Sequence, residues 1–90
     1  MTSAPAGATR ATVNVTVRYW ASARAVSGCD SEPLAGGSVD DVLAAASAAH
    51  TGLSVVLAVS TILLDGRAVT GSQPVSEGVT LEVLPPFAGG

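Results

Sequence analysis

Hydrophobic and polar residues alternate strictly in two segments, one near each end of the chain. In the first, Val13, Val15, Val17 and Tyr19 are separated by Asn14, Thr16 and Arg18. In the second, which covers 79–84, Val79, Leu81 and Val83 alternate with Thr80, Glu82 and Leu84. A two-residue period is typical of a β-strand with one buried face. We therefore expect both segments to be half-buried strands.

The clearest helical pattern begins after the chain-breaking pair Gly36-Gly37. Apolar positions recur there at helical spacing, on a stripe made by Val39, Val42, Leu43, Ala46 and, in the last turn, His50. Ser38 is suited to be the N-cap, and Asp40 and Asp41 lie in the first turn, where the helix dipole favours anions. The spacing of Ser38 and Asp41 approximates a capping box. Gly52 is suited to end the helix. We interpret the aspartates and His50 as end residues of a helix that packs on a sheet, and not as catalytic groups.

Two shorter elements are predicted between the first strand and the main helix. Residues 20–28 predict a turn with a short helical piece, which Ser27-Gly28 closes. A weak strand is expected over about 30–34, and Pro33 within it indicates an edge position because proline cannot donate to a ladder.

After the main helix, residues 53–59 are ambiguous between further helix and a buried strand. Residues 61–64 and 67–69 are expected to pair as a hairpin, because Asp65-Gly66 between them is a strong two-residue turn signal. Glu77-Gly78 predicts another turn just before the last strand.

The expected order is strand, strand, helix, strand, strand, strand, which indicates an α+β fold. The simplest arrangement is a ubiquitin-like β-grasp, a mixed sheet of about four to five strands with one main helix packed across it. The first and last strands are then adjacent at its centre, where both Val-rich faces are buried. We divide the chain into a disordered leader (1–12), a β-grasp domain (13–84) and a flexible, extended C-terminal tail (85–90).

Composition narrows the possible partners. The chain has 90 residues, 48% of them hydrophobic, but only three are aromatic, so the core must be mainly aliphatic. It contains four arginines and no lysine, with a net charge of −3. Nucleic acid and anionic membrane are therefore poor partners, and a basic protein surface is a better one.

No targeting or membrane-spanning segment is expected. The first twelve residues lack the apolar core of a signal peptide. The most apolar stretch, 53–64, is shorter than the roughly 20 residues that span a bilayer. A soluble, cytoplasmic protein is the expectation.

The single cysteine, Cys29, cannot form an internal disulfide, which fits a reducing compartment. A nucleophilic cysteine usually needs a nearby histidine, and His50 is the one histidine of the chain. We interpret Cys29 as an inert thiol. No metal site is predicted, because one cysteine and one histidine cannot supply a site without several carboxylates, and the carboxylates show no recognisable spacing.

The chain ends in Pro85-Pro86-Phe87-Ala88-Gly89-Gly90. Two terminal glycines place a carboxylate on a thread without side chains, which can enter a channel too narrow for other residues. The two prolines favour an extended path, and six residues reach roughly 20 Å when fully extended. This ending indicates that the terminal carboxylate itself is a working group.

Several motifs together resemble the small subunits of molybdopterin synthase. These are the segment 20–28 (WASARAVSG), Leu64-Asp65-Gly66-Arg67, Glu77-Gly78-Val79 and the Pro-Pro-Phe-Ala-Gly-Gly ending, and the similarity covers about 13–90. Ala25 stands where that family usually has glutamate. The sulfur carriers of thiamine biosynthesis share the fold and the Gly-Gly end, but they usually lack the Pro-Pro-aromatic spacer.

The resemblance implies a function for the end of the chain. An ATP-dependent adenylating and sulfurating enzyme would convert the Gly90 carboxylate, next to Gly89, into an acyl-adenylate and then a thiocarboxylate. Within the large subunit of molybdopterin synthase, expected as a heterotetramer, this group would donate sulfur to the cyclic pterin precursor. The large subunit would supply the acid–base groups. The chain alone would not be catalytic and would bind no cofactor, since the activating enzyme uses the ATP.

Partner contacts are expected beside this end. Phe87 and Pro86 are candidates for an apolar anchor, together with Ala88, because an exposed aromatic is a typical interface hot spot. By family analogy, Arg24 is a candidate for a polar contact.

Three alternatives remain open from the sequence. The first is a carrier of sulfur for thiamine or cysteine synthesis. The second is a ubiquitin-like modifier joined through Gly90 to lysines of target proteins. The third is a β-grasp interaction module whose Gly-Gly end has no chemical role.

Overall fold

The computed structural model describes residues 12–86 of the chain. It has eight elements, in the order β1 (Val13–Tyr19), α1 (Ala21–Ser27), β2 (Ser31–Gly36), α2 (Val39–Ala49), α3 (Leu53–Leu57), β3 (Thr61–Leu64), β4 (Arg67–Val69) and β5 (Thr80–Leu84). Most of the predicted leader (1–12) and most of the predicted tail (85–90) lie outside the described residues.

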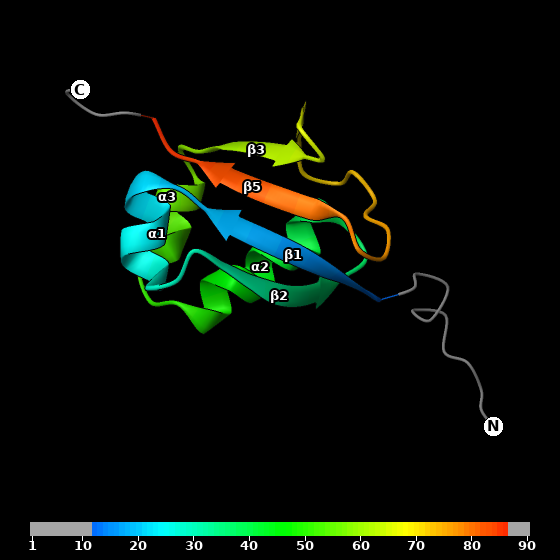
Figure 1. The fold of residues 1–90 in the computed structure, drawn as a ribbon, viewed down its shortest axis with the longest axis horizontal. Coiled ribbons are helices and arrows are strands. Elements are labelled where there is room, and N and C mark those ends of the chain that lie inside the picture. The colour runs from blue at the N-terminus through cyan, green and yellow to red at the C-terminus, as the bar shows by residue number, and fades with distance from the viewer. Residues whose placement is uncertain (1–11, 87–90) are drawn as a thin grey trace.

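The five strands form one mixed sheet in the order β2-β1-β5-β3-β4. The central pair, β1 and β5, is parallel, and the other three pairs are antiparallel. Helix α2 crosses one face of the sheet (Figure 1). The predicted α+β, ubiquitin-like β-grasp with the first and last strands at its centre is therefore confirmed.

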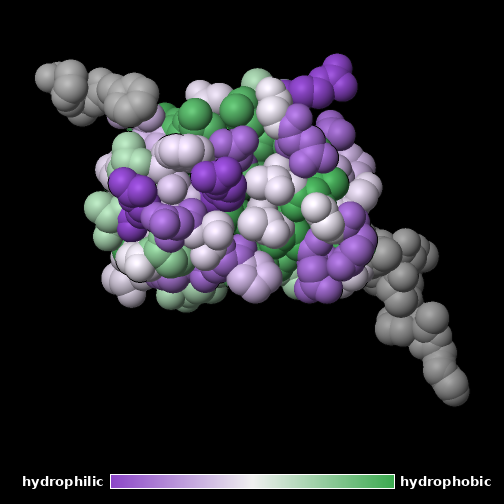
Figure 2. All heavy atoms as spheres, viewed as in Figure 1, coloured by the Kyte–Doolittle hydropathy of each residue, from purple (hydrophilic) through white to green (hydrophobic). Residues whose placement is uncertain are grey.

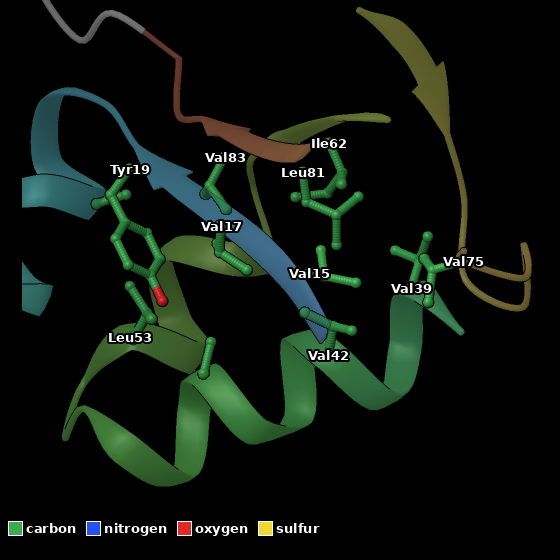
Figure 3. Packing of buried hydrophobic residues seen from close by; sticks show 12 residues of the cluster. Val15, Val17, Tyr19, Val39, Val42, Leu53, Ile62, Val75, Leu81 and Val83 are labelled. Carbon is green, nitrogen blue, oxygen red and sulfur yellow. The ribbon is translucent and has the colours of Figure 1, made fainter. Parts of the chain in front are cut away.

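The core lies between α2 and the sheet (Figure 3). Its most completely buried large side chains come from the two central strands and the helices: Val15, Val17, Leu81, Val83, Val39, Val42 and Leu53. Burying one such side chain contributes about 1.5–3 kcal/mol. The predicted inward faces of both Val-rich strands are confirmed, and these strands hold the sheet to the helix.

The start of α2 follows the predicted capping pattern in part. The Ser38 side chain accepts a hydrogen bond from the backbone N–H of Asp41 at 3.2 Å, as an N-cap should. The return bond goes one residue further back, because Asp41 Oδ2 accepts from the backbone N–H of Gly37 at 3.1 Å. The loop before α2 is thus tied to its first turn from both sides.

Two segments differ in detail from the sequence predictions. Strand β2 extends to Gly36, beyond the predicted 34, because Ala35 and Gly36 pair with the start of β1, and its edge position is confirmed. The ambiguous segment after Gly52 is the short helix α3. Its first residue, Leu53, is fully buried, whereas Val55 is 74% exposed, so this apolar run covers the core with one side only. None of the helices in the described range is long and apolar enough to cross a membrane.

The β3–β4 turn has the geometry that its sequence predicts. Asp65 and Gly66 both have positive φ, 48° and 87°, as the two central residues of a type I′ turn require. Asp65 Oδ1 also accepts a hydrogen bond from the backbone N–H of Thr80 at 3.0 Å. This turn therefore helps to hold the start of β5.

Gly36 is needed where β2 passes close to α2. A Cβ on this residue would lie 2.8 Å from Asp41 Cβ and 2.9 Å from Val42 Cγ2. We expect Gly36→Ala to lower the free energy of unfolding by about 1–3 kcal/mol, because overpacking displaces the helix. Denaturant unfolding measures this, with the exposed Ser31→Ala in the same strand as control. Equal stability of the two variants would show that α2 moves away at no cost.

Candidate functional site at the end of the central strands

Strands β1 and β5 end at the same edge of the sheet because they run parallel. Tyr19 pairs with Val83, and on the other side Thr61 pairs with Leu84. The backbone N–H of Trp20 also donates to the carbonyl of Val83 at 3.2 Å. The chain therefore leaves the sheet from its centre, with the last residues of β5 held on both sides (Figure 1).

Residues 84–86, here called the tail root, form the last described part of the chain. Pro85 is buried and Pro86 is exposed. Neither proline can donate a backbone hydrogen bond, so neither can extend the antiparallel ladder with β3 in the usual way. Pro86 is accessible to a partner, and its role as an anchor residue stays a prediction. Phe87, Ala88, Gly89 and Gly90 lie outside the described residues.

A polar and aromatic cluster lies beside the tail root, on the outer face of the sheet, opposite α2. The guanidinium of Arg18 lies 4.9 Å from the centre of the Trp20 ring. The Trp20 Nε1–H donates to Glu82 Oε1 at 3.0 Å, and Trp20 is 38% exposed. Figure 2 shows this face of the molecule, on which hydrophilic and apolar side chains are mixed. The cluster can recognise a partner surface through a flat ring flanked by one positive and one negative group.

The sequence pattern did not single out Arg18 or Glu82, and Trp20 appeared only within a motif. The available signal was that Arg18 and Glu82 occupy outward positions near the ends of the two Val-rich strands. Once those strands are paired in parallel, both positions fall next to the tail root.

Arg24 lies on α1 and takes no part in that cluster. Its side chain is exposed and pairs with Asp30 at 3.3 Å. Exposed ion pairs of this kind contribute at most about 1 kcal/mol and exchange partners easily. Arg24 is therefore accessible for a polar contact with a partner, which stays a prediction.

A second group of polar side chains lies on the inner side of the sheet, between the edge strand β2 and α2. Tyr19 Oη donates to Glu32 Oε2 at 2.5 Å, and His50 Nε2 lies 2.5 Å from the same oxygen. Burial, helped by the hydrogen bond to this carboxylate, raises the pKa of Tyr19 well above its usual range. The Cys29 thiol completes the group, with its sulfur, a Glu32 oxygen and a His50 nitrogen all within 4.8 Å of one another.

From the sequence, no metal site was predicted, Cys29 was interpreted as an inert thiol and not as a nucleophile paired with His50, and Glu32 was not considered. The fold brings all three together. Glu32 could have been found as an acidic residue at an inward position of a strand. In the structure it pairs with the fully buried Val17.

Comparisons with known proteins cover almost the whole chain. The family model named ThiS matches residues 17–90. No curated protein sequence gives a match. Among solved structures, the small archaeal modifier protein 1 of Methanosarcina acetivorans superposes with a TM-score of 0.80 at 23% identity, covering 88% of this chain and 98% of that one.

Two further solved structures carry names from molybdopterin biosynthesis. A Pyrococcus furiosus protein designated molybdopterin converting factor, subunit 1 has a TM-score of 0.76 at 26% identity, with 83% of this chain and 99% of that chain covered. A complex of subunits 1 and 2 of the molybdopterin-converting factor from Helicobacter pylori contains a chain with a TM-score of 0.66 at 23% identity, with 87% and 100% covered. These similarities show the same fold in proteins named as modifiers and as converting-factor subunits.

Proposed function

This chain belongs to the ThiS family, and from that premise we propose that it carries sulfur on the α-carboxyl group of Gly90, as the small subunit of a molybdopterin synthase. The observation that carries the proposal is that the family match runs through the Pro-Pro-Phe-Ala-Gly-Gly ending to the last residue. The tail root supports it, because the central position of β5 presents this ending from a fixed point on the sheet.

The chemistry explains why the chain needs a partner enzyme. A carboxylate is a poor electrophile, since its charge and resonance oppose a nucleophile. In adenylation by an ATP-dependent enzyme, a carboxylate oxygen attacks the α-phosphate of ATP and pyrophosphate leaves, so that AMP becomes a good leaving group on the carbonyl carbon. A sulfide-level sulfur nucleophile then displaces AMP. The product is a thiocarboxylate at Gly90, whose sulfur attacks the cyclic pterin precursor. Gly89 and Gly90 let this group pass through a narrow channel.

The large subunit of the synthase is the proposed partner in this last step. The structural similarity to a chain in the Helicobacter pylori complex supports an arrangement of this kind. Pro86 is exposed within the tail root, and the cluster of Arg18, Trp20 and Glu82 lies beside it. A net charge of −3 favours a basic partner surface, which also suits an anionic pterin substrate. The large subunit supplies the acid–base groups in a heterotetramer.

A second function is supported by one observation. The structural match to a small archaeal modifier protein favours a ubiquitin-like modifier, in which the activated Gly90 is joined to an amine of a target protein. Both functions begin with the same adenylate. They differ in the nucleophile that follows, which is sulfur in a carrier and a target lysine in a modifier. A carrier for thiamine or cysteine synthesis differs from the leading proposal only in its acceptor.

Intact-mass measurement of the protein isolated from its own cells separates the two functions. A sulfur carrier gives a fraction of free chain whose mass corresponds to one oxygen replaced by sulfur, and it copurifies with a pterin-synthase large subunit. A population found only as conjugates of higher mass, without the sulfur-containing species, would contradict the carrier function and support the modifier.

The anchor role proposed for Phe87 leads to a further prediction. We expect Phe87→Ala to weaken binding to the large subunit by at least tenfold, because a buried interface aromatic is commonly worth more than 1 kcal/mol. The melting temperature should change little. Isothermal titration and thermal unfolding measure the two effects, with Val55→Ala on the exposed side of α3 as control. A large loss of melting temperature with unchanged binding would assign Phe87 to the core.

A further inference from the structure

Three side chains of metal-ligand type meet between β2 and the end of α2, although they come from different parts of the chain. Glu32 is brought inward by the alternation of β2, opposite Val17. His50 is the C-cap of α2 and is held by its backbone N–H, which donates to the carbonyl of Ala46 at 3.1 Å. Cys29 follows Gly28, whose positive φ of 78° turns the chain from α1 into β2. Each position is set by backbone structure.

The three side chains are largely, but not completely, shielded from solvent. The side chains of His50 and Glu32 are only 17% and 21% exposed, and Cys29 is partly buried. A carboxylate in this position needs strong compensation for the water that it loses. The hydrogen bonds that Glu32 makes with Tyr19 and with His50 both use Oε2, so neither occupies its second oxygen, Oε1.

We propose that Cys29, Glu32 and His50 bind one divalent transition metal ion, with zinc as the preferred metal. One thiolate, one imidazole and one carboxylate are the ligand types that zinc uses, whereas calcium and magnesium prefer oxygen alone. Three protein ligands leave a fourth tetrahedral position for water or another small ligand. This site goes beyond sulfur transfer at Gly90 and does not depend on it.

The distances fit this role after small side-chain movements. Ligand atoms around a tetrahedral zinc are roughly 3–4 Å apart. The three donor atoms here lie within 4.8 Å of one another, and the closest pair, His50 Nε2 and Glu32 Oε2, is separated by 2.5 Å. The metal takes the place of the hydrogen bond between His50 and Glu32, so that these two side chains separate slightly while the cysteine sulfur approaches.

Tyr19 is a positioning residue for this site. Its ring meets the imidazole of His50 edge-on, with centroids 5.9 Å apart, and its hydroxyl donates to Glu32. Tyr19 is 2% exposed and fixed in the core. Outer hydrogen bonds of this kind orient metal ligands, and their loss commonly weakens metal affinity by about 10- to 100-fold.

Cobalt(II) titration of the reduced, untagged full chain tests the site, because a thiolate bound to cobalt gives a charge-transfer band in the near ultraviolet. The chain has one cysteine and one histidine, so the band can be assigned to Cys29. We expect saturation at one equivalent, displacement by zinc, and complete loss of the band in Cys29→Ser. Glu32→Gln and His50→Gln should each weaken zinc binding at least tenfold, and Tyr19→Phe by about tenfold.

The control is Asp30→Asn, which removes an exposed carboxylate next to Cys29 but outside the group and should leave zinc affinity unchanged. Alkylation of Cys29 by iodoacetamide in the unmodified chain gives a second readout that does not depend on the folding of any variant. Zinc should slow it at least tenfold. Metal binding without a thiolate band, unchanged affinity in Cys29→Ser, or no protection of Cys29 would overturn the proposal and leave a simple tyrosine–glutamate–histidine hydrogen-bond network.

Discussion

Deletion of Gly90 is expected to abolish sulfur transfer in a reconstituted pterin-sulfuration assay while leaving the fold unchanged. The shortened tail ends about 3.5 Å earlier, so its carboxylate no longer reaches the reacting atoms. A shift of this size is enough to stop chemistry that depends on positioning. Within residues 12–86, which the structure describes, the buried hydrophobic cluster runs from Val15 to Val83, and the ladder of β5 with β3 ends at Leu84. The melting temperature should therefore change by no more than about 4 °C.

Addition of a single alanine after Gly90 should have the same effect, because it moves the carboxylate and places a Cβ in the narrow channel. The matched control is one alanine added before Met1, which should leave both transfer and stability unchanged. Transfer at the normal rate by a chain with a shortened or extended end would mean that the reacting group is elsewhere.

The second large effect is expected from Leu81→Ala. Leu81 is completely buried in β5, the central strand that leads to the tail root, and it pairs with Val17 on β1 and Leu64 on β3. Removing its side chain leaves a cavity between the sheet and α2. We expect the free energy of unfolding to fall by about 2–5 kcal/mol, a large part of the total for a domain of this size. Chemical denaturation followed by circular dichroism measures it.

Val55→Ala is the matched control, since Val55 is 74% exposed and should change stability by less than about 0.5 kcal/mol. At a temperature at which Leu81→Ala is still folded, we expect it to accept sulfur at a normal rate. Leu81→Ala, which lowers stability, and the deletion of Gly90, which stops sulfur transfer, would then separate stability from chemistry. A stable Leu81→Ala protein would show that this core is not organised around β5.

Features that depend on neighbouring residues could be predicted from the sequence. The two Val-rich strands follow from a two-residue period, α2 from an apolar stripe behind the Ser38 cap, and the hairpin from Asp65-Gly66. Each of these signals lies within a few residues of the element that it predicts. The apolar run that forms α3 was ambiguous because five residues are too few to show a period.

Features that depend on distant residues could not be predicted in the same way. Trp20 and Glu82 are 62 positions apart in the chain and become neighbours only because β1 and β5 pair in parallel. Glu32 and His50 meet because α2 returns across the edge strand. One sequence does not reveal strand pairing, so neither the cluster beside the tail root nor the candidate metal site was visible.

We propose that the terminal carboxyl group of Gly90 carries the sulfur. Tandem mass spectrometry of the sulfurated protein tests it most directly, because the one cysteine, Cys29, is the natural alternative carrier as a persulfide. We expect the added sulfur to map to Gly90 as a thiocarboxylate and to be retained in Cys29→Ser. Sulfur located on Cys29, with an unmodified Gly90, would contradict it.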